Sequence, residues 1–193
     1  MDERRTWATG LSAYVERIQH LPEWAPLLED TKRRRQFCQE QWERTLPASL
    51  STMRSLTGLD FRRCFRVTVT YPGLPGGRTL DQTGPAECPN AIAWGGREEF
   101  PAYTVVYIWH EILHSYFEQT DRDHAIIELV TDNELRVRLN GGTYPPFEGH
   151  PYLGRWKAAV EPAWRAYLGQ GHRDIRQFAK LTRGYAPARG PTD

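Results

Sequence analysis

The sequence has few of the features that mark several classes of protein. Only three cysteines occur in 193 residues. Cys38, Cys64 and Cys88 are widely spaced and form no C-x-x-C pair, so we expect neither a disulfide framework nor a cysteine-based zinc site. Buried free thiols in a reducing compartment are the default expectation.

Long apolar runs and a charge imbalance are missing as well. No stretch approaches the roughly 18 apolar residues that indicate a membrane span, and the charged N-terminus lacks the apolar run of a secretory signal. Basic and acidic residues number 25 and 24, for a net charge of +1. We interpret the basic run at 32–35 as a solvated helix face. We therefore expect a cytoplasmic protein without a nucleic-acid or membrane partner; the sequence does not indicate an oligomeric state.

The length favours a single domain with a sizeable core. We assign residues 1–183 to this domain and expect 184–193, with two prolines and two glycines, to be a flexible tail. Seven tryptophans and nine tyrosines are many for this length, and we expect them to line the core and a cleft.

The hydrophobic periodicity predicts an α+β fold. Positions 65–71 alternate apolar and polar side chains, which is typical of a half-buried strand. Proline and glycine through 72–89 predict a loop, and 90–94 is a short apolar run that predicts a second strand. Apolar residues at helical spacing predict the helices. Three precede the strands, at 11–20, from 27 or 30 to 45, and at 51–56, and Pro47 is expected to end the second of them. Three more follow, from 121 or 123 to 139, from 154 or 155 to 168, and at 173–181.

The central motif is H-E-x-x-H, formed by His110, Glu111 and His114. Helix positions four apart differ by about 40° around the axis, so both imidazoles project from one face. That spacing suits two neighbouring ligands of a tetrahedral zinc. Glu111 lies between them in angle, where it can reach a metal-bound water as a general base without ligating the metal.

The residues around this motif argue against the simpler interpretation, an amphipathic helix with two ordinary polar histidines. The flanks are strongly apolar, so the helix is expected to be buried nearly all round. Two unpaired histidines and a carboxylate would be costly there. A metal site is the better explanation.

A hydrolytic zinc site needs a third protein ligand and keeps its fourth position for water. Glu118 would crowd the His114 side of the same helix, and His124 suits a three-histidine site but is expected in the turn before the next helix. Glu128 lies mid-helix in an apolar setting. The candidates on or before that helix are Glu118, His124, Glu128, Asp132 and Glu134.

The order His110-Glu111-x-x-His114 followed by Glu128-x-x-x-Asp132 resembles the gluzincin metallopeptidases, of which thermolysin is the best known. The resemblance covers roughly residues 90–140. It implies a zincin-like fold, in which a small sheet with an edge strand packs on the active-site helix. It also implies one Zn²⁺ held by His110, His114 and Glu128, with Glu111 as general base and later proton donor and Asp132 as the partner that orients a ligating histidine.

The short strand at 90–94 also resembles the substrate-binding edge strand of that family. Asn90, Ala91 and Trp94 are therefore expected to contact an extended peptide by strand addition. From the residues alone, a plain core strand is equally compatible. Two departures from the family matter: the spacer between His114 and Glu128 is shorter, and the whole chain is much smaller.

Amide hydrolysis further needs a donor to the tetrahedral oxyanion. Four residues beyond the second ligand helix are candidates, and we favour His150 and Tyr152 as catalytic residues over Tyr144 and His172. We expect a zinc-dependent metallopeptidase acting on a peptide or protein, with a narrow substrate range. The alternatives are a zinc-stapled binding or regulatory protein without turnover, in which Glu111 would be dispensable, and a zinc-dependent hydrolase of a non-peptide substrate.

Overall fold

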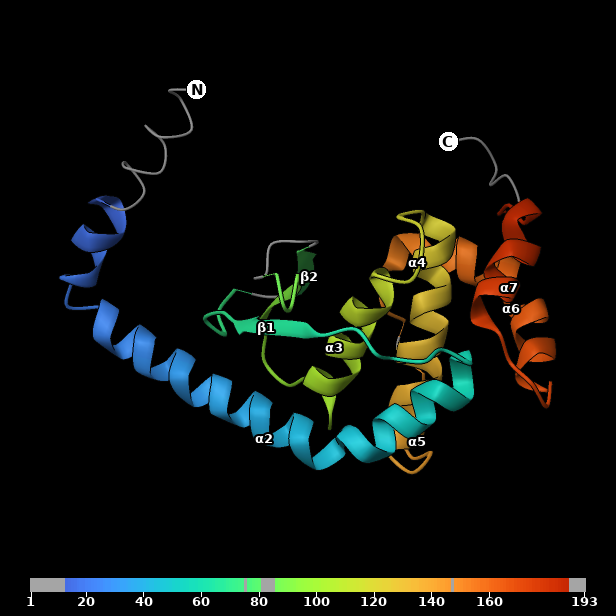
Figure 1. Ribbon diagram of the computed structural model, residues 1–193, viewed down its shortest axis with the longest axis horizontal. Helices are drawn as coiled ribbons and strands as arrows, with labels where there is room; N and C mark the ends of the chain where they lie inside the picture. Colours follow the sequence, from blue (N-terminus) through green and yellow to red (C-terminus); the bar gives the residue numbers. More distant parts are fainter. Residues whose placement is uncertain (1–12, 75, 81–85, 147, 188–193) are drawn as a thin grey trace, which may run out of the picture.

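The computed structural model describes residues 13–74, 76–80, 86–146 and 148–187, and it is a mixed α+β structure (Figure 1). Residues 13–19 are helical, which confirms the described part of the first predicted helix. The remaining elements follow in this order: α2 (Trp24–Thr57), β1 (Phe65–Val69), β2 (Gly76–Leu80), β3 (Asn90–Gly95), α3 (Tyr103–His114), α4 (Asp121–Glu128), the π-helical segment Leu129–Leu135, α5 (Arg136–Leu139), a 3₁₀ turn (Pro151–Leu153), α6 (Gly154–Leu168), α7 (Ile175–Leu181) and a 3₁₀ turn (Thr182–Gly184).

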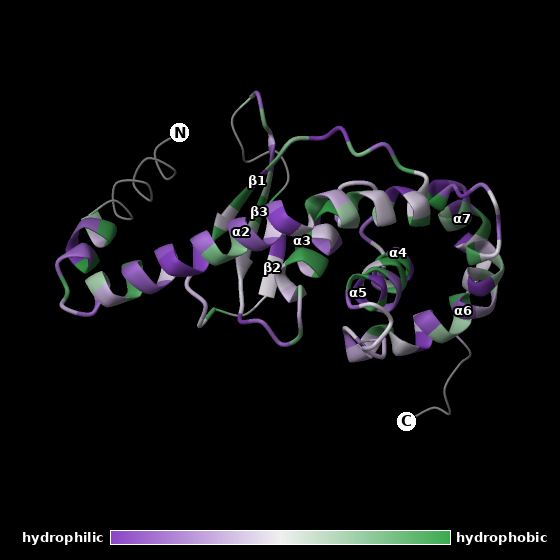
Figure 2. Ribbon diagram, turned by 90° about the horizontal axis from the view of Figure 1, so that it is seen from below, coloured by the Kyte–Doolittle hydropathy of each residue, from purple (hydrophilic) through white to green (hydrophobic). Residues whose placement is uncertain are grey.

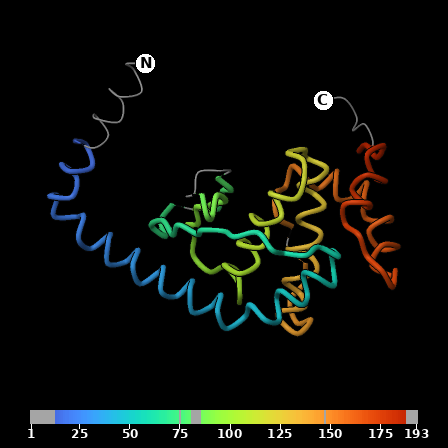
Figure 3. The backbone as a smooth tube through the Cα atoms, viewed as in Figure 1, coloured from blue at the N-terminus to red at the C-terminus, as the bar shows by residue number. Residues whose placement is uncertain are grey.

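The long helix α2 passes beneath α3 and the π-helical segment (Figure 3). The prediction that Pro47 ends a helix is wrong, because α2 continues through it to Thr57. A proline removes one backbone donor, whereas apolar residues are buried on both sides of it, including Cys38, Met53 and Leu56. Hydrophobic and hydrophilic residues alternate along this helix in Figure 2. Tertiary packing of one face thus outweighs the local helix-breaking signal.

The N-terminus of α3 is fixed by a polar cluster reaching from α2. Glu98 accepts a hydrogen bond from the backbone N–H of Thr104 and another from its hydroxyl. The guanidinium of Arg34 donates to Glu98 at 2.9 Å and to Thr104 at 2.8 Å. The prediction that positions 32–35 form a solvated face is therefore wrong at Arg34, which anchors the metal-motif helix.

Within the described residues the sheet has three strands in the order β1-β3-β2. β1 pairs with β3 in parallel and β2 pairs with β3 antiparallel. Two predictions are wrong here. Positions 76–80 form a strand instead of a loop, because β3 offers them a pairing edge that a glycine-rich sequence does not reveal. β3 is the central strand, with β1 and β2 at the two edges, whereas the resemblance implied an edge strand at 90–94.

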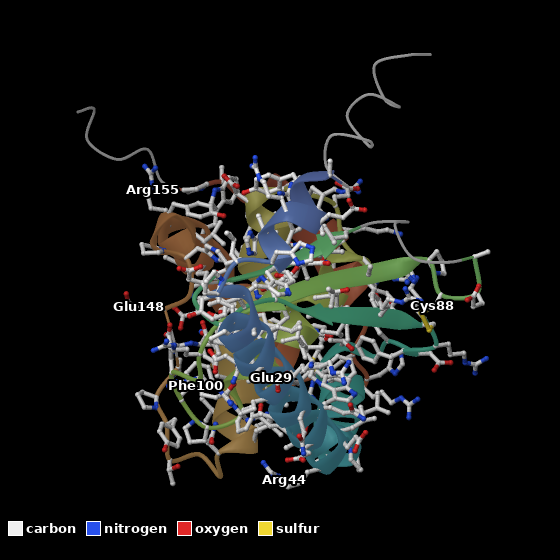
Figure 4. All side chains as sticks on the ribbon, turned by 90° about the vertical axis from the view of Figure 1, so that its left-hand side faces the viewer. Glu29, Arg44, Cys88, Phe100, Glu148 and Arg155 are labelled. Atoms are coloured by element: carbon white, nitrogen blue, oxygen red, sulfur yellow. A yellow bond between two sulfur atoms is a disulfide. The ribbon has the colours of Figure 1, made fainter. Side chains whose placement is uncertain are left out.

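A disulfide joins Cys64, just before β1, to Cys88, just before β3, and the expectation of three free cysteines is wrong. Figure 4 shows the sulfur atoms beside the labelled Cys88, at one end of the sheet. The parallel register of β1 and β3 brings the two Cα atoms within 5.2 Å although 24 positions separate them. Cys38 stays free and buried.

Helices α3 to α7 enclose the core. The predicted helices at 121–139, 154–168 and 173–181 are confirmed, with Pro162 accommodated inside α6. The hydrophobic core joins residues from α2, β3, α3, α4, α6 and α7, among them Met53, Ile92, Leu113, Ile126, Val160 and Ile175. Of the expected tail, 185–187 lack regular structure and 188–193 lie outside the described residues. None of the helices in the described ranges combines the length and hydrophobicity needed to cross a bilayer.

Candidate metal centre

The H-E-x-x-H motif lies in the last two turns of α3, where the helix is almost completely buried. Val105, Val106 and Leu113 have no exposed surface, and His110 and Glu111 expose 2% and 7%. The predicted burial of this helix is confirmed. His110 and Glu111 are thus buried polar side chains that each require a specific partner, whereas His114 is only partly buried.

His110 and His114 are joined by His124 from α4. The nitrogen atoms that these three imidazoles offer lie within 4.8 Å of one another, and the Nε2 atoms of His110 and His124 are 3.0 Å apart. Two nitrogens bound to a tetrahedral zinc at about 2.0–2.1 Å lie about 3.3 Å apart. The donor set therefore fits a divalent metal ion with a preference for imidazole.

The electrostatics of the cluster keep its histidines neutral. Burial lowers the pKa of His110 far below its ordinary value, and the neighbouring histidines lower it further. Burial and the same neighbours lower the pKa of His114 to about 4, and that of His124 is lowered mainly by burial. Neutral imidazole is the form that binds a metal.

Thr131 defines which nitrogen of His110 faces the cluster. Its hydroxyl donates to the carbonyl of Ile127 at 2.9 Å and lies 3.5 Å from His110 Nδ1. Because the hydroxyl hydrogen is committed to Ile127, the remaining interaction is donation from His110 Nδ1–H to Thr131. That tautomer leaves the lone pair of Nε2 directed into the cluster.

Glu128, the third ligand implied by the resemblance, occupies a different place. The described residues contain two groups that could hold a metal ion, and His124 belongs to both. One group is His110, His114 and His124; the other is His124, Glu128 and His150. The buried carboxylate of Glu128 accepts hydrogen bonds from the backbone N–H and Nδ1 of His150, at 2.8 and 2.6 Å. The loop between α3 and α4 is short enough to bring the first turn of α4, with His124, beside the motif, while Glu128 as a metal ligand stays a prediction.

Asp132 does not orient His110, contrary to expectation; Thr131 is the residue at Nδ1. The reason is the π-helical segment Leu129–Leu135. A π turn contains more residues than an α turn, so side chains in this segment do not keep the angular spacing that an α-helix predicts. Asp132 is fully buried, and within the described residues neither carboxylate oxygen has a hydrogen-bond partner. Burial raises its pKa to about 7, and the negative charge of Glu128 contributes.

Glu111 lies beside the three histidines and contacts β2. Thr79 donates to its carboxylate at 2.8 Å. A side chain at Gly77 would meet Glu111 Oε1 at 2.9 Å, so glycine allows the strand to approach the carboxylate. Burial raises the pKa of Glu111, and the hydrogen bond from Thr79 opposes that rise. No sequence pattern predicts either contact, since both depend on the pairing of β2 with β3.

An open cleft of about 460 Å³ exposes this centre. One wall is formed by β2, from Gly76 to Thr79, and the floor carries the histidine cluster together with Glu111. The remaining lining residues are Tyr107, Gln119 and His150. A second groove shares His114 and Gln119 with this cleft and reaches Asn90 and Arg63.

Of the two favoured catalytic residues, His150 lies in the cleft. Its ring centroid is 4.7 Å from that of His124 and 6.2 Å from that of His110. The hydrogen bond to Glu128 raises the pKa of His150, against the effect of burial. Tyr152 is 57% exposed, and its hydroxyl lies 3.4 Å from His124 Nδ1. Tyr144 instead stacks with Arg136.

The three residues expected to bind substrate lie in the central strand. Ala91 and Trp94 are buried, the latter completely, and their backbones pair with β1 and β2. Both sides of β3 are already paired, so this strand has no edge left for strand addition. Asn90 alone reaches a groove beside the motif, where its side-chain amide donates to the carbonyl of Cys64 at 2.9 Å.

Comparison of the chain with models of protein families, with curated proteins and with solved structures gives no match. The geometry of the site therefore carries the functional argument.

Proposed function

We propose that this protein is a zinc-dependent hydrolase, and that its substrate is a peptide bond. The observation that carries the proposal is the grouping of His110, His114 and His124 around one point, with Glu111 beside them, at the floor of an open cleft. Three imidazoles suit zinc, and a catalytic zinc site is typically made of three protein ligands with one open position. A structural metal site would need only the histidines, so the presence of Glu111 beside them favours a catalytic site.

The metal, when bound, supplies Lewis-acid activation of water and of the scissile carbonyl. Glu111 removes a proton from the attacking water and delivers it to the leaving amine. The hydrogen bond from the Thr79 hydroxyl holds the Glu111 carboxylate toward the histidine cluster. His150 lines the same cleft; in its imidazolium form it keeps Nδ1–H on Glu128 and donates from Nε2–H to the carbonyl oxygen as negative charge develops there.

An extended peptide suits this cleft because β2 forms one of its walls. Within the described part of the sheet, β2 pairs on one side only, with β3. The residues of β2 that line the cleft are Gly76 to Thr79, and backbone groups of a strand in such a place are of the kind that bind a peptide by strand addition. This supports a zincin-like arrangement in which β2 takes the role first expected of 90–94.

The test combines metal analysis with a peptide-library digest. We expect about one zinc per chain and cleavage that chelation abolishes and zinc restores. Glu111→Gln should keep the zinc and lose turnover by at least about 100-fold, the usual scale for general-base catalysis. Full activity in that variant would sink the assignment of Glu111. Loss of fold on chelation, without any hydrolysis by the wild type, would support a zinc-stapled binding protein instead.

The compartment stays a prediction. The spacing of the cysteines predicted free thiols and hence a reducing compartment. The structure instead has the disulfide Cys64–Cys88, and disulfides are more typical of oxidising compartments than of the cytoplasm.

A further inference from the structure

The segment that carries His150 into the cleft is held by a single buried carboxylate. Glu128 exposes no surface, and its Oε1 accepts both hydrogen bonds from His150, one from the backbone and one from Nδ1. Nδ1 is therefore occupied, and the opposite ring nitrogen is the one available to a substrate. The carboxylate thus fixes both the position and the rotation of this imidazole.

The residue before His150 fits against the same carboxylate. Gly149 has a φ of +67°, and a Cβ atom at this position would lie 2.5 Å from the carboxyl carbon of Glu128. Any side chain here would both strain the backbone and displace Glu128. Glycine is therefore what allows the backbone to close over the carboxylate.

Lys157, from α6, completes the arrangement. Its Nζ forms an ion pair with Glu128 Oε2 at 3.1 Å, and its side chain is only 14% exposed. The same Nζ donates to the carbonyl of Glu148, which Figure 4 shows on the opposite side of the molecule from Cys88. Glu148 and His150 are thus bonded to one Glu–Lys pair, and Gly149 between them lies close against it.

We infer that Glu128 and Lys157 are positioning residues for His150, and that Glu128 holds this loop instead of ligating the metal. The inference rests on the proposed function for its catalytic consequence, since it assigns His150 its orientation in that chemistry. A buried carboxylate without its lysine would be an uncompensated charge, so the two residues act as a unit.

The first experiment compares zinc content with kinetics in Glu128→Gln. We expect about one zinc per chain, as in the wild type, and a kcat reduced by about 10- to 100-fold, as for lost orienting contacts, with little change in KM. Glu134→Gln on the same helical stretch is the matched control and should behave as wild type. Loss of zinc in Glu128→Gln would overturn the inference and restore Glu128 as a ligand; unchanged kcat would overturn it as well.

Lys157 is tested by Lys157→Met and Lys157→Arg. We expect the methionine variant to lose kcat by about 10-fold and the arginine variant to recover most of it, because the charge beside Glu128 is retained. The double variant Glu128→Gln/Lys157→Met removes both charges and guards against simple misfolding. Its kcat should be no lower than that of Glu128→Gln alone, because the effects of substitutions at two residues in contact do not add. If the losses in kcat of the two single variants added up in the double variant, Glu128 and Lys157 would not act together. Lys180→Met, at an exposed position on α7, is the control.

A spectroscopic reading separates this inference from the proposed function. In the zinc-free protein, the imidazole ¹⁵N and ¹H signals of His150 should report a hydrogen-bonded Nδ1 that Glu128→Gln and Lys157→Met both perturb. This result would stand even if the wild type hydrolysed no peptide. His150 signals that are identical in all variants would refute the positioning role.

Discussion

The hydroxyl of Thr79 lies 2.8 Å from both the carboxylate Oε2 and the backbone carbonyl of Glu111. When Glu111 is ionised, the hydroxyl hydrogen is available to its carboxylate. When Glu111 is protonated, the acid can donate to Thr79 Oγ1 while Thr79 donates to the carbonyl. One strand residue therefore serves both protonation states of the proposed general base.

Replacing Thr79 by valine keeps the shape of the side chain and removes this hydrogen bond. We expect kcat to fall by about 10-fold, because a single hydrogen bond to a charged group contributes about 1.5–3 kcal/mol. Thr79→Ser should retain most of the activity. The measurement is steady-state cleavage of a peptide found in the library digest, and equal rates for the valine variant and the wild type would exclude this role.

Gly77→Ala tests how closely β2 must approach the motif. The added methyl group would lie 2.9 Å from Glu111 Oε1 and 3.0 Å from Trp94 Cε3, and the buried indole cannot move aside. We expect lower turnover with zinc content unchanged, since the ligands lie on α3 and α4. Gly171→Ala, where a Cβ meets nothing within 4 Å, is the control; a Gly77→Ala enzyme as active as the control would contradict the proposed contact.

His124→Ala should weaken zinc binding by at least about 100-fold, because it removes one of three protein ligands. Competition with a fluorescent zinc chelator measures the affinity directly. His172→Ala changes an exposed histidine and should leave the affinity unaltered. Wild-type affinity in His124→Ala would show that another residue completes the site.

Asp132 gives a prediction for stability against pH. Its folded-state pKa of about 7 lies above the value of about 3.9 expected for the unfolded chain. The protonated acid therefore fits the fold, and stability is lost as the pH rises from about 4 to about 7. The loss is on the order of 4 kcal/mol as an upper figure.

Asp132→Asn removes this titration and should be more stable than the wild type at pH 7 by a few kcal/mol. Urea unfolding at several pH values provides the measurement. The difference between the two proteins should grow from pH 4 to pH 7 and then stay constant. A difference that does not vary with pH would contradict the assignment to Asp132.

Reduction of Cys64–Cys88 should affect stability and turnover more than metal content. The bond closes a loop of 24 positions that includes β2, and such a constraint contributes about 3 kcal/mol. We expect a lower melting temperature and slower cleavage after reduction, with zinc retained. The double variant Cys64→Ser/Cys88→Ser should match the reduced protein and be insensitive to reductant; zinc loss in either sample would argue that the sheet supports the ligands.

Local patterns in the sequence predicted the parts of the fold that depend on local physics. The apolar alternation at β1 and the helical periodicity of α3 and α4 mark faces that the chain must bury. β2 was missed because Gly76 and Gly77 resemble a turn, and its strand conformation comes from pairing with β3. The extent of α2 was missed because burial overrides the signal of Pro47.

The same division holds for the site. His110, Glu111 and His114 are related by helical spacing alone, and the structure places all three in one cleft. The placement of His124 depends on how α4 turns back on α3, and that of Asp132 depends on a π-helical segment, neither of which periodicity indicates. Thr79, Gly77 and Lys157 come from distant segments, and no sequence pattern connects them to the motif.

The histidine cluster lies between positions 110 and 124 of the chain, whereas Thr79 and His150 reach it from segments far on either side. Contacts between nearby positions form sooner in folding than those that close long loops. We therefore expect the three histidines to come together during folding before β2 and the 148–150 loop are in place. Any metal ion bound at that stage would be held before Thr79 and His150 had joined the site.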